Sequence, residues 1–428
     1  MTLVARAYWE GAPFFFRQEP EDARVDSLYF RSADHRQVSG LYWTRVSHPR
    51  PRIAAVLMHP RVDFSRHYAI PRLLAAGIGV LAAHTRNPNN DTTTVHEEII
   101  LDLGACVRVL REEHGVEKVL LIGNSGGGSL DALYQSQATL APSARLQTTP
   151  GGVSTALGRV EMIPADALVL ISAHKGQGMV MNECIDPAVV DESDPDESDE
   201  TLDMYRAANG FLEAPNWSSY SADFVEHYRA AQLARVKRLD ERARALIGEN
   251  QQAVEIRSDP GFQSLEQEAQ RAVMRREVHE PIMVVYRTMA NLHYVDNHLD
   301  PSPREYGSLL SDRPDLMNQQ ILGFGRVCSP HAWLSTWSGH SSNANLLKTL
   351  PGVRVPTLVV HAGRDREIYP ETDAKPIFEA VGADDRTFVE FARARHYFEP
   401  DLGATEAPDV ELLMDRLMPW IGERLGEA

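Results

Sequence analysis

The chain has 428 residues, of which 43% are hydrophobic and 24% are charged, and its formal net charge is -17 at pH 7. This composition is typical of an ordinary globular protein and excludes a disordered or fibrous chain. The negative charge argues against nucleic acids and anionic membrane surfaces as partners, because both repel an acidic protein. The length suits two or three average domains, or one large α/β domain that carries an insertion.

The cysteines and the N-terminal residues predict the cellular setting. Cys106, Cys184 and Cys328 are odd in number and far apart, which predicts neither a disulfide framework nor a paired-cysteine zinc site. Residues 1–20 lack the basic segment, apolar stretch and small-residue cleavage site of a secretory leader, and no apolar run reaches the length of a membrane span. We therefore expect a cytoplasmic protein. The sequence leaves open whether the chain forms a homo-oligomer.

The first part of the chain alternates between strand and helix patterns. Residues 25–31 and 37–46 alternate apolar with polar side chains and predict an antiparallel pair at one edge of a sheet. The later apolar runs are continuous, as in strands that are buried on both faces. These strands are predicted at residues 53–58, 78–83, 118–122 and 167–172, with helices at 68–76 and 95–114. This alternation predicts a mostly parallel sheet covered by helices on both faces, with ligands bound at the carboxyl ends of its strands.

One short motif lies where such a strand meets a helix. Gly123-Asn124-Ser125-Gly126-Gly127 directly follows the apolar run 118–122 and precedes a helical stretch. A serine on so tight a turn is raised above the sheet edge, where a base can reach its hydroxyl and a substrate carbonyl can approach. The motif therefore predicts a nucleophilic serine at position 125.

The alternation stops between residues 173 and 350. Helical patterns at 222–247 and 263–278 predict a mostly helical segment inserted into the sheet fold. The acidic run 191–200 lacks the glycine and the distal glutamate of a calcium loop, so we interpret it as a solvated loop. Near the end of the insertion, Trp333 and Trp337 are candidates to line a substrate pocket.

The sheet pattern returns in the last part of the chain. Apolar strands are predicted at 356–361 and 386–391, and a final amphipathic helix at 408–425. Asp365 follows the first of these strands and His396 follows the second. The chain order is therefore nucleophile, acid, base.

Three motifs together resemble the α/β-hydrolase superfamily. They are Gly123-Asn124-Ser125-Gly126-Gly127, Gly363-Arg364-Asp365-Arg366-Glu367-Ile368 and Arg395-His396-Tyr397-Phe398. The resemblance implies an α/β-hydrolase core in two parts, residues 1–172 and 351–428, with a large, mostly helical cap inserted at 173–350. Within this superfamily, the chain most resembles capped bacterial serine esterases and carbon–carbon bond hydrolases.

The chemistry assigns a role to each residue of this triad. Ser125 needs an imidazole that removes its proton and then protonates the leaving group, and His396 has the position for this task. Asp365 would hold that ring in the correct tautomer. His361 and His59 are the rival bases, and Glu367 is the nearest substitute for the acid.

The oxyanion of the tetrahedral intermediate needs two N–H donors. Gly126 N–H supplies one, and we expect the second from the loop after residue 58. Pro60 has no N–H, so Arg61 N–H is the candidate. His59 is a candidate to support this loop or to contact the substrate. Asn124 is expected to orient the neighbouring backbone.

These residues predict a serine hydrolase that cleaves a carboxylic ester of a small molecule through an acyl-enzyme on Ser125, with no metal or cofactor. A carbon–carbon bond hydrolase of a ring-cleavage or diketone product is the main alternative, and lactones, thioesters and amides stay open as substrates. A non-catalytic ligand-binding protein of the same fold is the alternative from another class.

Overall fold

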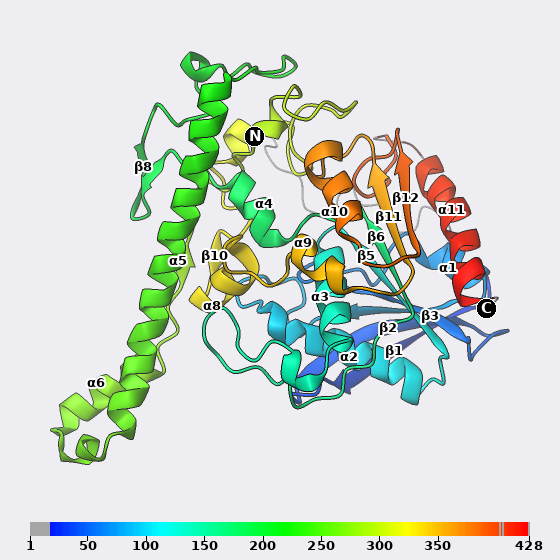
Figure 1. Ribbon diagram of the computed structural model, residues 1–428, viewed down its shortest axis with the longest axis horizontal. Coiled ribbons are helices and arrows are strands. Elements are labelled where there is room, and N and C mark those ends of the chain that lie inside the picture. The colour runs from blue at the N-terminus through cyan, green and yellow to red at the C-terminus, as the bar shows by residue number, and fades with distance from the viewer. Residues whose placement is uncertain (1–17, 402–403, 405, 427–428) are drawn as a thin grey trace.

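An eight-stranded sheet forms the centre of the molecule. The computed structural model describes residues 18–401, 404 and 406–426, and the sheet has the order β1-β2-β4-β3-β5-β6-β11-β12 (Figure 1). β2 pairs antiparallel with β1 and β4, whereas every other neighbouring pair is parallel. The strands are Ala23–Arg31 (β1), Gln37–Arg45 (β2), Ile53–Leu57 (β3), Gly79–His84 (β4), Lys118–Asn124 (β5), Ala167–Ile171 (β6), Thr357–Ala362 (β11) and Arg386–Phe391 (β12). This arrangement confirms the predicted edge pair and the mostly parallel sheet.

Helices cover both faces of the sheet because its strands are apolar on both sides. Along β3, Ala54 and Val56 pack against one helical layer, and Ile53, Ala55 and Leu57 pack against the other. The first layer contains α2 (His96–Glu112) and α3 (Gly126–Ala138), and the second contains α1 (Ile70–Ala75) and α11 (Pro408–Leu425). Alternate side chains of a strand point to opposite faces, so a continuous apolar run is what a central strand requires.

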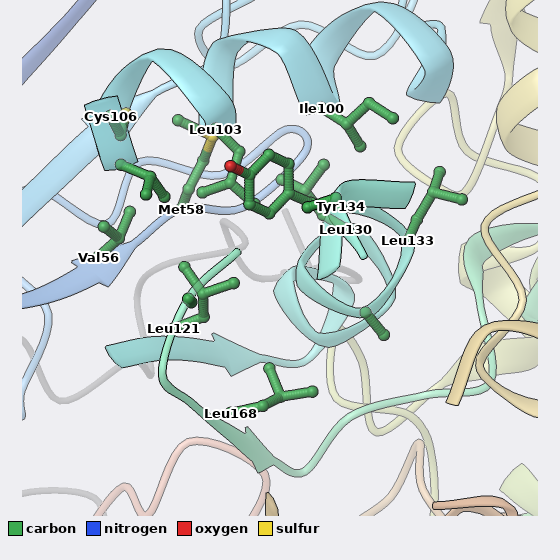
Figure 2. Close-up of a cluster of buried hydrophobic side chains, with 14 of the residues drawn as sticks. Val56, Met58, Ile100, Leu103, Cys106, Leu121, Leu130, Leu133, Tyr134 and Leu168 are labelled. Carbon is green, nitrogen blue, oxygen red and sulfur yellow. The ribbon is translucent and has the colours of Figure 1, made fainter. Parts of the chain in front are cut away.

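Figure 2 shows the core of the first layer. Tyr134 of α3 lies under α2, and its hydroxyl donates to the carbonyl of Ile163 at 2.6 Å. A Cβ at Gly104 of α2 would lie 3.1 Å from the Tyr134 ring, so the glycine allows the two helices to approach closely. Leu121 and Leu168 close the cluster from β5 and β6. This packing fixes α3, and with it the turn that precedes α3.

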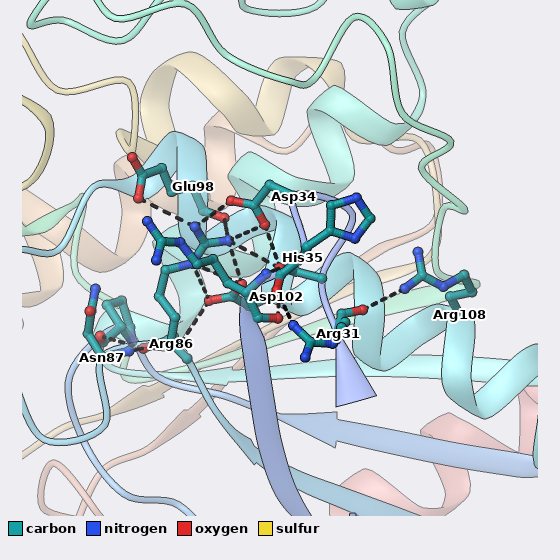
Figure 3. Close-up of polar contacts among 12 residues, drawn as sticks. Arg31, Asp34, His35, Arg86, Asn87, Glu98, Asp102 and Arg108 are labelled. Carbon is teal, nitrogen blue, oxygen red and sulfur yellow. Dashed lines mark hydrogen bonds and ion pairs between the residues drawn. The ribbon is translucent and has the colours of Figure 1, made fainter. Parts of the chain in front are cut away.

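A buried ion-pair network fastens the antiparallel edge to α2. Arg86, just after β4, pairs with Asp34 at 2.6 Å and with Asp102 at 2.7 Å, and Glu98 lies 3.4 Å away (Figure 3). Asp34 belongs to the turn between β1 and β2, whereas Glu98 and Asp102 belong to α2. The Asp102 side chain is fully buried, so Arg86 supplies the compensating charge that it needs.

A helical region lies between β6 and β11. Its longest element, α5, has 37 residues and runs along one side of the molecule, and with α6 at its far end it extends beyond the sheet (Figure 1). The elements here are α4 (Gln177–Cys184), β7 (Val189–Asp191), β8 (Asp194–Ser198), α5 (Ala222–Ser258), α6 (Gln267–Glu277), β9 (Met283–Val284), α7 (Pro314–Met317), β10 (Val327–Cys328), α8 (Pro330–Ala332) and α9 (Leu346–Thr349), and α10 (Lys375–Ala380) follows β11. None of the helices in the described residues combines the length and the apolar surface needed to cross a bilayer.

Two details of this region differ from the prediction. The first helix continues past residue 247 to Ser258 and ends before Pro260, because a residue that precedes proline is disfavoured in a helix. A short 3₁₀ turn, Pro260–Ser264, then separates α5 from α6. The second predicted helix therefore begins later than expected.

The acidic run forms a hairpin, so the predicted loop is wrong, but the run is exposed or half-buried throughout, as predicted for a solvated segment. β7 and β8 pair antiparallel across residues 189–198. Glu192 in the hairpin turn accepts from the buried Arg235 guanidinium of α5, with Nε and Nη2 both 2.7 Å from its carboxylate oxygens. Residues 191–200 contain seven carboxylates, and this ion pair gives one of them, Glu192, a structural partner. The composition of the run does not reveal such a partner.

Candidate active site

Ser125 occupies a strained turn at the carboxyl edge of the sheet. β5 ends at Asn124, α3 begins at Gly126, and Ser125 between them has φ 54°. Non-glycine residues rarely adopt this left-handed conformation, and such strain is concentrated at functional positions. A Cβ at Gly123 would lie 2.5 Å from backbone atoms of Gly128, so position 123 must be glycine for the turn to close.

The side chain of Asn124 stabilises this turn through hydrogen bonds. Its Oδ1 accepts from the Tyr68 hydroxyl at 2.8 Å and lies 3.1 Å from His67 Nε2, and its Nδ2 donates to the Ile171 carbonyl at 2.9 Å. The backbone N–H of Ser125 donates to the same carbonyl at 2.9 Å. The side chain of Asn124 is thus fully occupied with scaffold contacts, in keeping with the role expected for it.

Asp365 and His396 form a buried pair on the loops after β11 and β12. Nδ1 of His396 lies 2.7 Å from Oδ2 of Asp365. Oδ1 of Asp365 accepts the backbone N–H groups of Glu367 at 2.8 Å and Ile368 at 3.2 Å, which fixes the carboxylate. Burial alone would lower the pKa of His396, but the charge and the hydrogen bond of Asp365 outweigh it and the pKa is raised. The pair therefore favours the imidazolium.

Ser125 and His396 line the same small cavity, which has a volume of about 30 Å³. Nε2 of His396 is buried and makes no hydrogen bond to any described residue. His59 and Trp337 also line the cavity. Trp333 does not: it is buried within the helical region, where its indole donates to Asp240 Oδ1 at 2.8 Å. The prediction that Trp333 lines the substrate pocket is therefore wrong for this cavity.

The structure also contradicts the choice of Arg61 N–H as the second oxyanion donor. The N–H groups of Arg61 and Val62 both donate to Nδ1 of His59, at 3.1 and 3.0 Å. An N–H that is directed at its own loop is not presented to the cavity. The Arg61 guanidinium pairs with Asp91 at 2.6 Å and lies 5.4 Å from the ring centres of both Phe324 and Trp337.

Three further polar residues of the cavity were missed or given a different role. His174 and Gln177 follow β6, and the only available signal was their place just after a predicted strand. Glu367, considered only as a substitute acid, lines the cavity itself. Its carboxylate accepts from the Tyr294 hydroxyl at 2.8 Å and from Leu309 N–H at 2.9 Å, so it does not hold His396. Burial raises the pKa of Glu367 to about 7.

A larger cavity of about 290 Å³ lies beside the small one. Arg61 lines both cavities, and Leu310 and Gly323 of the larger one are chain neighbours of Leu309 and Phe324 in the smaller one. The helical region thus contributes to the walls of both spaces.

No protein-family model matches the chain, and no curated protein matches it in sequence. Among solved structures, an esterase from Pyrococcus furiosus is similar over 96% of this chain and 97% of its own, at 13% identity and a TM-score of 0.41. The esterase domain of a Rhodothermus marinus protein covers 94% of this chain and 100% of its own, at 13% identity and a TM-score of 0.42. A hypothetical protein from Pseudomonas aeruginosa covers 99% of both chains, at 12% identity and a TM-score of 0.48.

The chain's own topology identifies the fold. The evidence is its strand order, its antiparallel edge and the Ser125 turn between β5 and α3. The chain has the α/β-hydrolase fold, with a large helical region inserted between β6 and β11.

Proposed function

We propose that the protein is a serine hydrolase that cleaves carboxylic esters through an acyl-enzyme on Ser125. The observation that carries this proposal is that Ser125, on its strained turn, lines the same cavity as His396. Asp365 lies at hydrogen-bond distance from Nδ1 of that imidazole and leaves Nε2 for the serine. A serine hydroxyl is a weak nucleophile until a base removes its proton, and these residue types in this arrangement supply the base and its support.

The proposed reaction has two halves. In the first, Ser125 Oγ attacks the ester carbonyl while His396 Nε2 takes the hydroxyl proton and then delivers it to the leaving alcohol. In the second, His396 takes a proton from a water that attacks the acyl carbon. The bond to Ser125 Oγ then breaks, the acid is released, and His396 returns the proton to Oγ. Asp365 stays ionised and stabilises the imidazolium in both halves.

We propose that residues 173–350 act as a cap over this site. Trp337, Phe324 and Leu309 of that segment line the cavity with Ser125. Apolar walls of this kind exclude bulk water, which strengthens each electrostatic contact with the reacting atoms. The cap would also select the substrate by its shape.

Labelling with a fluorophosphonate tests the proposal without any assumption about the substrate. We expect intact mass to show one adduct on the parent protein and none on Ser125→Ala. Ser172→Ala is the matched control, because Ser172 is also buried at a strand end and its hydroxyl makes no hydrogen bond to the described residues. Absence of an adduct on the folded parent protein would contradict the proposal.

A panel of 4-nitrophenyl esters, lactones, thioesters and β-diketones then identifies the bond that is cleaved. Turnover of esters supports the proposal. Turnover of diketones alone would reassign the protein to carbon–carbon bond hydrolysis, and tight binding without turnover would favour a ligand-binding protein.

A further inference from the structure

The space beside the Cα of Gly126 is surrounded by side-chain nitrogens that the proposed triad does not use. A Cβ at Gly126 would lie 2.8 Å from His59 Nε2, 3.1 Å from Gln177 Nε2 and 3.2 Å from His174 Nε2. All three side chains line the cavity that holds Ser125. Gly126 follows the nucleophile directly, so this space adjoins the position where negative charge develops during attack.

The hydrogen bonds of His59 fix which of its nitrogens carries a proton. Its Nδ1 accepts the backbone N–H groups of Arg61 and Val62. A nitrogen that accepts two such bonds cannot itself be protonated, so the neutral ring carries its proton on Nε2. Burial, together with the nearby charge of Arg61, holds the pKa of His59 well below its usual value. At neutral pH the cavity therefore faces a neutral Nε2–H.

His174 has the same tautomer for the same reason. Its Nδ1 accepts the N–H of Gly176 at 3.1 Å, which leaves the proton on Nε2. Removal from water lowers the pKa of His174 to about 3. Two imidazoles thus direct N–H groups, and no acceptor nitrogen, at one small space. Such a space suits an oxygen that becomes negative and disfavours a ligand that must donate.

We propose that His59 supplies, through its Nε2–H, the second hydrogen bond to the oxyanion, opposite the backbone N–H of Gly126. This inference rests on the proposed function, since it concerns the oxyanion formed when Ser125 attacks. It also explains why the loop after β3 can contain Pro60, which has no N–H, and can turn Arg61 N–H inward. The N–H groups of Arg61 and Val62 hold the His59 ring, and the ring is the oxyanion donor. Because the proton is already in place, no reorganisation is needed during attack.

Two substitutions of His59 separate the donor role from a purely structural role. His59→Asn keeps an acceptor oxygen near the position of Nδ1 for the loop but removes the donor at Nε2. His59→Gln can reach the position of Nε2 with an amide N–H but gives the loop no acceptor at Nδ1. A donor role predicts that Asn loses activity and that Gln restores part of it, whereas a structural role predicts the opposite order.

The readout is the ratio of rates for 4-nitrophenyl acetate and its thiono counterpart, in which sulfur replaces the carbonyl oxygen. Sulfur accepts hydrogen bonds weakly, so a lost oxyanion donor slows the oxygen ester more than the thiono ester. We expect His59→Asn to lower kcat for the oxygen ester by about 10²–10³-fold, the usual effect of removing one such donor, and to lower the ratio. His67→Asn is the matched control: this buried histidine also accepts a backbone N–H but supports Asn124 outside the cavity, so the ratio should stay constant.

Five outcomes would overturn the inference. An unchanged ratio in His59→Asn would remove the donor role, and a ratio that falls only in His174→Asn would transfer it to His174. Nitrogen-15 NMR of histidine-labelled protein that finds the His59 proton on Nδ1 would remove the donor role of His59 without any activity measurement. If fluorophosphonate fails to label Ser125 in the parent protein, the proposed function falls first and this inference falls with it. If labelling proceeds equally fast in parent and His59→Asn, only the inference fails.

Discussion

Nδ1 of His396 lies 2.7 Å from Oδ2 of Asp365, and both side chains are almost completely removed from solvent. The opposite nitrogen of the ring remains without a hydrogen bond to the described residues, next to the cavity that Ser125 lines. One carboxylate therefore determines the tautomer and the orientation of the proposed base.

Replacing Asp365 with Asn should lower kcat by up to about 10⁴-fold, because an amide favours the wrong tautomer of the histidine while the geometry survives. Steady-state kinetics with the best ester of the panel measures this effect. Asp385→Asn is the control, since its exposed carboxylate pairs with Arg424 away from the cavity. A loss of less than tenfold in Asp365→Asn would mean that another acid supports His396.

The pH profile should report His396. A base must be neutral to accept a proton, so kcat/KM should fall as the pH drops through the raised pKa of His396, which lies above the ordinary value of about 6.5. In Asp365→Asn the opposing charge is gone and burial lowers the pKa, so the acid limb should move to lower pH. An acid limb that shifts in Glu367→Gln and not in Asp365→Asn would assign it to Glu367 instead.

Glu367 should make stability depend on pH. Its folded pKa of about 7 lies above the usual value of 4.5, so the native state favours the protonated carboxyl. Stability from this group is present below the unfolded pKa and is lost as the pH rises through the folded pKa. Relative to Glu367→Gln, the parent protein should lose up to about 3 kcal/mol between pH 4 and pH 8. Urea unfolding of both proteins at these pH values measures the difference, and a parallel pH dependence would contradict the prediction.

Gly126→Ala should abolish activity while the fold is retained. The new Cβ would lie 2.8 Å from His59 Nε2 and would fill the space proposed for the oxyanion, whereas alanine suits the first turn of a helix. Gly248→Ala in α5 is the matched control: nothing lies within 4 Å of its Cβ, so activity should stay constant and stability should rise by up to about 1 kcal/mol. Circular dichroism and ester kinetics on the two variants test this contrast, and an active Gly126→Ala would refute it.

Arg86→Met should destabilise the protein by about 3–5 kcal/mol, because it leaves the fully buried Asp102 without a compensating charge. Arg24→Met is the control, since the exposed Arg24 and Asp26 pair contributes about 0–1 kcal/mol. Chemical unfolding followed by fluorescence provides both values. Equal effects of the two substitutions would show that the network in Figure 3 is not needed for stability.

Much of the fold could be predicted because continuous apolar runs and their spacing determine which strands are central. The Ser125 turn and the order of Asp365 and His396 followed from the same pattern. The positions of individual side-chain contacts did not follow from this pattern. Trp333 and Trp337 are four residues apart and would share one face of an α-helix, but they lie on a wider π-helical turn and only Trp337 lines the cavity.

The second oxyanion donor could not be predicted from residue types either. Proline at position 60 excludes one N–H, but the direction of the next one depends on where the ring of His59 lies. The sequence places His174 after a predicted strand, but only the pairing of β6 with β5 shows that this strand end lies beside Ser125. A single sequence contains no record of such through-space relations.

The sheet order has a consequence for synthesis of the protein. β11 lies between β6 and β12, and the loops after β11 and β12 carry Asp365 and His396. A ribosome-bound chain that has emerged only as far as α5 contains Ser125 but neither partner of its proposed triad. The nascent protein would therefore be unable to attack esters in the cell until its last strands are translated and docked.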